Sequence, residues 1–316
     1  MPGLNLLGTG EALDASLNTI ISEFYLTRDE EVMLKKLARQ HELREHSGRS
    51  YVLNTYSRVT ARDLSDGVDI TEGQDLADAQ STYSPAEVGL KVIVPRTTVR
   101  RIADPSLMEN VGRMLSAAYN LKEEQDGTAQ FDSFTITRGS AGTVMGVGHI
   151  ASAVSALGVG NSVTVPEPAP GPYSAVFHPC TLHAILMRMA PVTDVPTGTN
   201  AYLPTTANRA DTVGAGMTER SHVLLEQGIK AIKMMGGAQV HASANVLADA
   251  SNDAKSGVFS KEGLRYISEF EPTVEKTDDK SLRGMEVVIA GSYAWGVYKP
   301  AVFGVEMLFD AIIPTS

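Results

Sequence analysis

Residues 104–134 read DPSLMENVGRMLSAAYNLKEEQDGTAQFDSF. Asp104 is a good N-cap, and a proline at the next position, Pro105, suits the first turn of a helix. The stretch therefore predicts one helix, which would be about 45 Å long at 1.5 Å per residue if it ran to Phe134. Gly127 is a place where this helix can break. Its apolar stripe consists of Leu107, Met108, Val111, Leu115 and Ala118.

The segment before this helix divides into a helical part and an extended part. A second helix is predicted from Thr27, where Glu30 completes a capping box, to Gly48. Residues 51–56 and 89–95 are rich in strand-forming residues and flank a polar, acidic middle. An isolated pair of strands is only marginally stable in water, so this pair is expected to pack against another part of the protein or a partner. The first helix is predicted from the helical spacing of Leu13, Leu17, Ile20, Ile21 and Phe24.

Shorter elements are predicted after the long helix. Together with the first hundred residues they indicate an α+β protein. In chain order they are a helix near 147–157, a Pro- and Gly-rich linker at 165–172, a buried strand at 173–177, a helix from His178-Pro179, a loop at 191–217, a helix at 218–227, a strand pair turning at Gly236-Gly237, and strands at 285–289, 293–298 and 302–313.

Composition restricts the partners and the compartment. Hydrophobic residues make up 43% and charged residues 20%, as in ordinary globular proteins. A single cysteine, Cys180, cannot form an intramolecular disulfide, which fits a reducing cytoplasm. The start lacks a secretory pattern, and no apolar run approaches the roughly 20 residues of a membrane span. The formal charge of −10 argues against a DNA-binding module and is neutral for a container.

No catalytic, cofactor-binding or metal-binding residue is predicted. The glycine-rich stretch 139–148 lacks the Gly-Lys-Ser/Thr ending of a phosphate loop and is interpreted as a connector. A remote alternative is a nucleotide-binding α/β enzyme, which nucleotide binding by the monomer would favour. His178, Cys180 and His183 lack the further ligands of a zinc site. His241 is expected to be exposed, and Trp295 is expected to be a core or interface anchor.

The order of several weak motifs resembles that of the major capsid proteins of tailed bacteriophages. Residues 60–69 and 84–92 resemble the extended loop of that family, and 100–105 resembles the entry to its spine helix. Further resemblances lie at 175–179, 228–246 and 257–264 and in the closing run to Asp310. The resemblance implies an N-terminal arm (1–50), an extended loop (51–98), a peripheral domain (99–172, with a spine helix at about 104–134), an axial domain (173–280) and C-terminal strands returning to the peripheral domain (281–316).

The resemblance also implies a function without catalysis or cofactors. Hexamers and pentamers of the chain would close into an icosahedral head that encloses double-stranded DNA, assembled in the bacterial cytoplasm and carried in the virion. Implied partners are a portal protein, a decoration protein and, because the arm is short, a separate scaffolding protein. Residues 191–217 and 247–257 are candidates either for loops at symmetry axes or for ordinary surface loops. An encapsulin-type nanocompartment, with a cargo-loading peptide as partner, is the nearest alternative.

Two segments of opposite charge suggest how neighbours find their register. The basic stretch 35–49 carries net +3 and the acidic stretch 61–80 carries −5. We hypothesise that the arm of one subunit meets the extended loop of another. Exposed ion pairs contribute only about 0–1 kcal/mol each, so they would steer rather than bind. Separation by more than a Debye length, about 10 Å at 0.1 M salt, would refute the pairing. The residues predicted to pair are, on the arm of one subunit, Lys35, Lys36, Arg39, Arg44 and Arg49 and, on the extended loop of its neighbour, Asp63, Asp66, Asp69, Glu72, Asp75 and Asp78.

Overall fold

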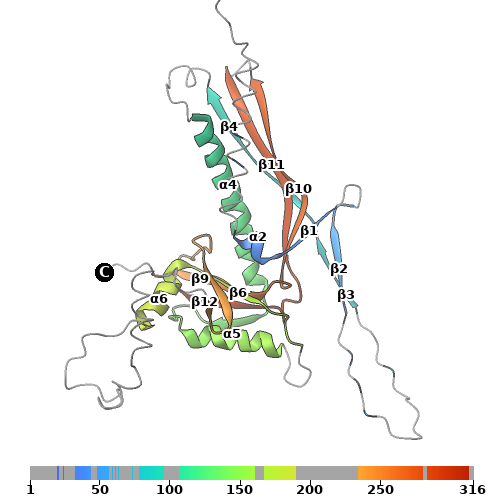
Figure 1. Cartoon of the computed structure of the whole chain (residues 1–316), viewed down its shortest axis with the longest axis vertical. Coiled ribbons are helices and arrows are strands. Elements are labelled where there is room, and N and C mark those ends of the chain that lie inside the picture. The colour runs from blue at the N-terminus through green and yellow to red at the C-terminus, as the bar shows by residue number, and fades with distance from the viewer. Residues whose placement is uncertain are drawn as a thin grey trace, which may run out of the picture. The chain divides into compact units, whose positions relative to one another are not determined.

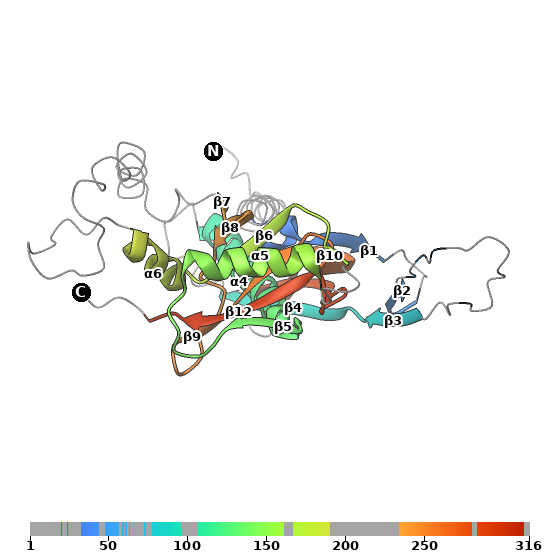
Figure 2. The same ribbon diagram turned by 90° about the horizontal axis from the view of Figure 1, so that it is seen from below.

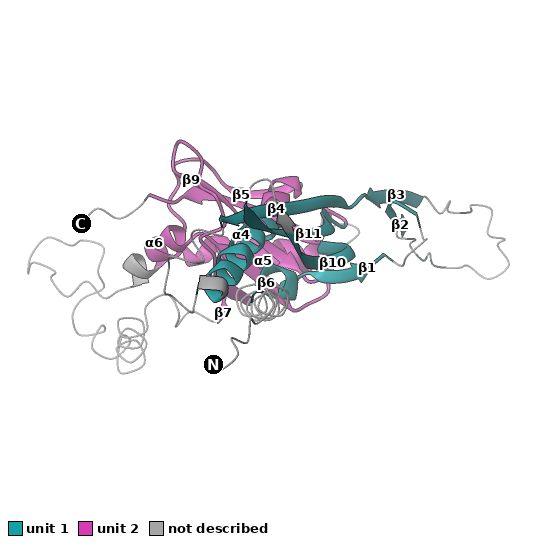
Figure 3. Ribbon diagram, turned by 90° about the horizontal axis from the view of Figure 1, so that it is seen from above, with its two compact units in different colours: residues 1–127, 264–298 teal, residues 128–263, 299–316 magenta. Residues whose placement is uncertain are grey.

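The computed structural model describes residues 20, 24, 33–43, 48–56, 59, 61, 63, 73, 78–95, 107–160, 167–189, 234–279 and 283–312. The chain forms two compact units (Figure 3). The first unit comprises residues 1–127 with 264–298, and the second comprises 128–263 with 299–316. Each unit combines helices with a β-sheet, which confirms the α+β class. In the described part of the chain, no helix is both long enough and apolar enough to cross a membrane.

The first unit is built on a four-stranded sheet in the order β1-β10-β11-β4. Strands β10 (Leu264–Asp279), β11 (Gly284–Val297) and β4 (Ala86–Pro95) are antiparallel neighbours, and β1 (Arg39–Glu42) pairs with β10 in parallel. Side chains alternate along β11, so that Met285, Val287 and Ile289 are buried on one face. Figure 1 shows helix α4 lying along these strands. The predicted strands 285–289 and 293–298 are thus one continuous strand.

Helix α4 (Leu107–Ala129) is the predicted long helix, and it is about 35 Å long at 1.5 Å per residue. The prediction that it runs to Phe134 is wrong, because the 3₁₀ turn η1 (Gln130–Ser133) follows Ala129. Its start at 104 lies outside the described residues. The predicted stripe is also wrong at Ala118, which is exposed, whereas Tyr119 is buried.

The buried face of α4 turns around the helix axis. Buried positions recur every four residues, at 111, 115, 119, 123 and 127. Because an α-helix has 3.6 residues per turn, a four-residue spacing rotates the buried face by about 40° at each step. The rotation lets one helix meet different neighbours along its length. Tyr119 packs edge-on to Tyr293 of β11, and a Cβ at Gly127 would lie only 2.9 Å from Trp295.

The N-terminal segment packs on α4 and then joins the sheet. Ile20 and Phe24 are helical and fully buried, in agreement with the predicted first helix, and Phe24 packs edge-on to Tyr119. The predicted helix from 27 to 48 is wrong in its second half. A single turn, α2 (Leu34–Leu37), ends at the extended residue Ala38, and β1 follows. Parallel pairing with residues 265–268, far along the chain, overrides the local helical pattern.

The second unit is built on a six-stranded sheet in the order β5-β12-β9-β6-β8-β7. Figure 2 shows helix α5 lying across this sheet. The imidazole of His149 on α5 contacts the ring of Phe309 on β12, with the ring centroids 4.8 Å apart. Helix α6 follows β6 directly, as predicted. The predicted loop 191–217 and helix 218–227 lie outside the described residues. The element bounds are β5 Ile136–Gly139, α5 Val147–Val159, β6 Tyr173–Phe177, α6 Pro179–Met189, β7 Met234–Met235, β8 Ala238–Ala242, β9 Asp253–Ser260 and β12 Gly304–Asp310.

A cluster of three aromatic rings covers the other face of this sheet. Phe131, Phe134 and Phe259 are at most 3% exposed, and their ring centroids lie 5.6 to 6.5 Å apart. Two strand glycines make room for them. A Cβ at Gly257 would lie 2.6 Å from Phe131, and one at Gly304 would overlap the ring of Phe134. These strands therefore need residues without a side chain where the rings lie.

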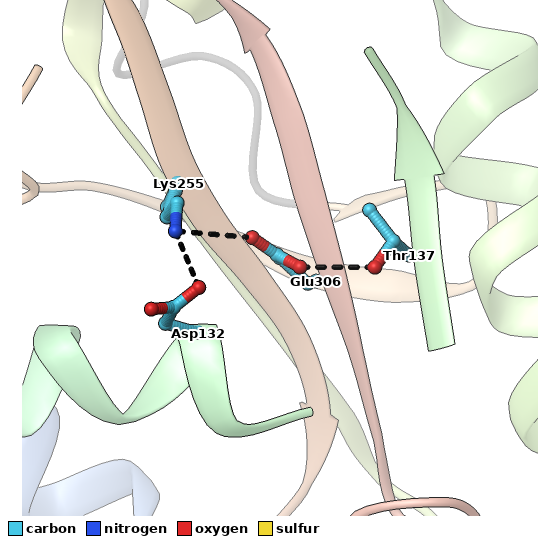
Figure 4. A network of polar contacts seen from close by, with 4 residues as sticks. All are labelled: Asp132, Thr137, Lys255 and Glu306. Atoms are coloured by element: carbon cyan, nitrogen blue, oxygen red, sulfur yellow. Dashed lines mark hydrogen bonds and ion pairs between the residues drawn. The ribbon is translucent and has the colours of Figure 1, made fainter. Parts of the chain in front are cut away.

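A polar network lies on the same side of the sheet (Figure 4). The ammonium group of Lys255 on β9 contacts Asp132 of η1, and it lies 4.0 Å from Glu306 Oε1 on β12. The hydroxyl of Thr137 on β5 donates to Glu306 Oε2 at 2.9 Å. Hydrogen bonding to Asp132 raises the pKa of Lys255. The network links three strands and the turn after α4.

Replacing Lys255 by methionine tests this network. We expect Lys255→Met to lower the free energy of unfolding of the second unit by about 1 kcal/mol, because the pair with Asp132 is half-exposed and therefore weak. Thermal unfolding at low and high salt measures the effect. The loss should shrink at high salt, because salt screens exposed charges. An equal loss at both salt concentrations would show that the exposed ion pair is not responsible.

The predicted division into arm, loop and domains stays a prediction. It follows the roles of the segments in an assembled shell, whereas the two units are compact groups within one subunit. The longest difference concerns residues 128–172, which were predicted in the peripheral domain but lie in the second unit. Another concerns residues 264–280, predicted as the end of the axial domain. They lie in the first unit, because β10 pairs along almost its whole length with β11.

Candidate assembly surfaces

A two-stranded hairpin belongs to the first unit. Strands β2 (Tyr51–Tyr56) and β3 (Asp78–Tyr83) pair antiparallel, with Tyr51 opposite Tyr83 and Tyr56 opposite Asp78. Tyr83 is the buried residue of the pair, and every other residue of both strands is half-buried or exposed. Val52 and Tyr56 lie on the same face because side chains alternate along a strand, and they are 48% and 54% exposed. The predicted strand at 51–56 is confirmed, but its partner is 78–83 rather than 89–95. The predicted second strand, 89–95, lies in β4 and pairs with β11 of the four-stranded sheet.

Tyr83 holds the root of the hairpin against the main sheet. Its hydroxyl donates to the carbonyl oxygen of Val297 at 2.7 Å. The ring lies over Gly296 of β11, where a Cβ would overlap it. Burial raises the pKa of the Tyr83 hydroxyl. A buried, hydrogen-bonded aromatic residue thus fixes where the hairpin leaves the sheet.

A second contact at the root involves β1 and β10. The guanidinium Nη1 of Arg265 lies 2.7 Å from Nε2 of His41, and the hydroxyl of Tyr51 lies 3.2 Å from Nδ1 of the same imidazole. The rings of His41 and Tyr51 stack with centroids 4.8 Å apart. The guanidinium of Arg265 also lies over the ring of Tyr298, 4.8 Å from its centroid. This group joins residues from three strands.

The exposed side of α4 carries a second apolar surface. Met114 is 72% exposed and Leu121 is 46% exposed, one on each side of the exposed Ala117 and Ala118. Ion pairs between residues four apart flank this stripe, Glu109 with Arg113 and Lys122 with Asp126. Large apolar side chains gathered on one exposed helix face are typical of a surface that meets another protein.

The structure describes only some of the predicted charged assembly residues. Arg44, Asp66, Asp69, Glu72 and Asp75 lie outside the described residues. Lys36, Arg39, Arg49, Asp63 and Asp78 are exposed. Lys35 already has a partner in its own chain, because its ammonium group lies 3.2 Å from Glu271 of β10 and over the ring of Tyr266. The proposed pairing of arm and loop between subunits stays a prediction.

Glu124 of α4 anchors the arm and was not predicted from the sequence. Its Oε1 atom accepts hydrogen bonds from the backbone N–H groups of Met33 (2.8 Å) and Leu34 (2.7 Å), at the start of α2. Burial raises the pKa of this carboxyl, although the two hydrogen bonds oppose the shift. Glu124 belongs to a second buried series with the same four-residue spacing, at 112, 116, 120, 124 and 128. Because this series consists of glycine and polar residues, the sequence carries no signal that it is buried.

The residues that the sequence analysis considered and rejected as metal-binding, phosphate-binding or catalytic residues make contacts within the fold. His178 lies directly before α6, where its Nδ1 accepts the backbone N–H of Cys180 at 3.3 Å. In the connector after β5, the N–H of Gly142 donates to the carboxylate of Asp253 at 2.7 Å. Contrary to the expectation that it is exposed, His241 is partly buried, and burial lowers its pKa. In the described ranges, no three His, Cys, Asp or Glu side chains are grouped closely enough to hold a metal ion.

Comparison with solved structures identifies the fold. No family model matches the chain, and no curated protein sequence matches it. A chain of Mycobacterium phage Che8 superposes with a TM-score of 0.61 at 14% identity, over 88% of this chain and 91% of that chain. The capsid of Ralstonia phage GP4 superposes with a TM-score of 0.62 at 12% identity, over 89% of this chain and 88% of that chain. The capsid of cyanophage P-SCSP1u superposes with a TM-score of 0.58 at 12% identity, over 89% of each chain. Despite the low identity, the chain has the fold of the major capsid proteins of tailed bacteriophages.

Proposed function

We propose that this chain is a major capsid protein, a structural subunit rather than an enzyme, that assembles with copies of itself. Hexamers and pentamers would form an icosahedral head enclosing double-stranded DNA, and the mature protein would be carried in the virion. Portal and separate scaffolding proteins are the expected partners during assembly in the bacterial cytoplasm. The likeness of fold to phage capsid chains over 86–90% of this chain supports the capsid over an encapsulin-type shell.

The hairpin β2–β3 is the observation that carries this proposal. An isolated pair of strands is marginal in water. Here one face exposes Val52 and Tyr56, while the buried anchor Tyr83 lies at the root. Covering those side chains with a neighbouring subunit would bury apolar area and stabilise the hairpin at the same time. A monomeric protein would gain nothing from keeping them exposed.

The double variant Val52→Asp, Tyr56→Asp tests the proposal. Losing two half-exposed apolar contacts costs about 2 kcal/mol per subunit interface. We therefore expect the concentration needed for shell formation to rise at least about tenfold. Negative-stain microscopy and sedimentation of the expressed full chain measure shells and capsomers. Unfolding should change little, because neither side chain lies in the core.

The matched control is Val52→Ile, Tyr56→Phe, which keeps the apolar face and the strand-forming residues. It should assemble like the parent protein. Compact monomers from the parent chain itself would contradict the proposed function. Shells of unchanged yield from the double Asp variant would show that this face is not an interface. Shells filled with a specific protein cargo, instead of DNA, would favour the encapsulin-type alternative.

A further inference from the structure

Strand β4 lies at the edge of the four-stranded sheet of the first unit. In the described part of the chain it pairs with a strand on one side only, and that strand is β11. Every second residue of an edge strand directs its N–H and C=O groups away from its neighbour. Such a row of backbone groups is a template for pairing with another chain. Because β4 is ten residues long, it offers more of these groups than a short edge strand does.

The two faces of β4 differ in chemistry. Val88, Leu90 and Val92 alternate along one face, which is half-buried and continues the apolar face of β11. The other face is exposed and carries Glu87 and Lys91, four residues apart. A second strand at this edge would therefore meet an apolar row on one face and two opposite charges on the other.

The two charges remain accessible to a partner. Nζ of Lys91 lies 2.6 Å from Oε1 of Glu286 on β11, but the Lys91 side chain is still 48% exposed. Among the described residues, no ion pair involves Glu87. A lysine on an edge strand usually discourages pairing with another chain. It does so less when the incoming strand places an acid opposite the lysine, because opposite charges on paired strands attract.

One symmetrical register of two β4 strands supplies that acid. In an antiparallel ladder, opposite residues either exchange two hydrogen bonds or exchange none, so around a two-fold axis odd-numbered residues face odd-numbered ones. With Gly89 facing Gly89 of a second copy, Glu87 faces Lys91 and Lys91 faces Glu87. Moving the axis by one residue pairs neither charge with the other. Moving it by two sets Glu87 against Glu87, or Lys91 against Lys91.

The same register also suits the rest of the strand. Pro85, which has no N–H group, would lie opposite Ile93 of the second copy, so the ladder would span Ala86–Val92 and end before the proline. On the half-buried face, Val88 would lie opposite Leu90. Apolar pairs on one face and ion pairs on the other both favour this alignment.

We propose that β4 is a self-pairing edge, through which two copies of the chain join their four-stranded sheets in antiparallel fashion, centred on Gly89. The two equivalent pairs of Glu87 with Lys91 select the register more than they supply affinity. A ladder of this length is smaller than a stable interface, so the contact is reversible in free chains. Icosahedral shells contain two-fold axes, at which the same patch of two subunits meets. Placing the contact on such an axis rests on the proposed function, whereas the pairing itself does not.

Cysteine trapping of the expressed full chain tests the register. Glu87→Cys and Lys91→Cys are made separately in a Cys180→Ser background, so that the native thiol does not compete. Mild oxidation of an equimolar mixture should give a disulfide-linked dimer, because opposite Cβ atoms of paired strands lie about 4.5–5.5 Å apart. Either variant alone should give little dimer, because its two cysteines would lie four residues apart along the ladder, about 13 Å.

Two outcomes of the trapping experiment would overturn the proposal. One is a mixture that gives no dimer. The other is either variant giving as much dimer alone as in the mixture, which would indicate a different register or random collisions. Far-ultraviolet circular dichroism checks that both variants fold, as expected for substitutions at exposed positions.

The ion pair that remains in the trapped dimer is tested by charge reversal in the same assay. Adding Lys91→Glu to the Glu87→Cys chain sets an acid against Glu87 of the other chain, and dimer formation should slow about fivefold at low salt. Adding Glu87→Lys to that other chain restores opposite charges and should recover most of the rate. Equal slowing with and without this second change would contradict the ion pair.

Glu286→Gln is the matched control for charge on this face. It removes the carboxylate that Lys91 contacts within its own chain and leaves Glu87 of the second copy in place. Dimer formation should therefore be as fast as in the parent mixture, or faster. Slower trapping in this variant would show that Glu286, rather than Glu87, controls the edge, and it would overturn the assigned pair.

The pairing and the proposed function can fail independently. Shells that form without the mixture-specific dimer would leave the function intact and overturn the pairing. A mixture-specific dimer from a chain that forms no shells would support the pairing and remove the proposed function.

Discussion

Phe134→Ala is expected to lower the free energy of unfolding of the second unit by about 4 kcal/mol. Phe134 is 3% exposed and lies between Phe131, Phe259 and the backbone at Gly304. Removing a buried phenylalanine loses its transfer free energy and leaves a cavity, which together typically cost about 3–5 kcal/mol. Hydrogen exchange of β9 and β12 measures the loss. Trp295, the only tryptophan, lies in the first unit and should report almost no change.

A double-mutant cycle with Gly304 shows whether the ring and the glycine depend on each other. Gly304→Ala alone should cost about 2 kcal/mol, because the added methyl overlaps the Phe134 ring. In the Phe134→Ala background the same methyl enters the vacated space, so its cost should largely disappear. A coupling energy of about 1–3 kcal/mol is expected. Simple addition of the two losses would show that the ring does not depend on the glycine.

Glu124→Ala is expected to destabilise the first unit by about 3 kcal/mol, whereas Glu124→Gln should stabilise it at neutral pH. Alanine leaves the N–H groups of Met33 and Leu34 buried without their acceptor, and each costs about 1–3 kcal/mol. Glutamine keeps an oxygen in the position of Oε1. It also removes the negative charge of the carboxylate, which burial disfavours, as the raised pKa of the carboxyl indicates. Urea unfolding followed by Trp295 fluorescence measures both variants.

The pH dependence of Glu124 has a definite sign. Its folded-state pKa is raised by burial, so ionisation costs stability. That cost is complete above the folded-state pKa and disappears as the pH falls through it toward the ordinary value of about 4.3. The advantage of Glu124→Gln over the parent should therefore shrink on acidification. A glutamine variant as unstable as the alanine variant at neutral pH would show that the ionised carboxylate is required.

Local patterns predicted the elements whose neighbours are close in sequence. The start of α6 at Pro179, the turn at Gly236-Gly237 and the helix around Val111 and Leu115 follow from spacing and capping. Strand β1 could not be predicted in this way. Residues 39–42 have a helical neighbourhood, and their partner strand lies more than 200 residues away. The long strand β10 was missed as well, because it is polar and interrupted by Pro272.

The sequence predicted that the candidate assembly surface includes a hairpin, but it did not predict the contacts that hold the hairpin in place. The strand patterns at 51–56 and 89–95, on either side of an acidic middle, predicted a hairpin that needs support, but its second strand is 78–83. The residues that support it, Tyr83, His41 and Arg265, come from separate strands, and the pair His41 and Arg265 is 224 residues apart in sequence. Pairing between subunits depends on how two copies of the chain are arranged, which a single sequence does not describe. The charges of the arm therefore could not show which segment of a neighbour it contacts.

The strand glycines that accommodate aromatic rings have a consequence for how this sequence can change. At Gly257, Gly296 and Gly304, any side chain would meet a ring or displace it. The rings themselves can shrink or exchange with other apolar groups at a graded cost, whereas a glycine here has no intermediate replacement. In a library of all single substitutions, these positions should be among the least tolerant in the chain. Much of the information that specifies the two cores would then reside in residues that contribute no side chain.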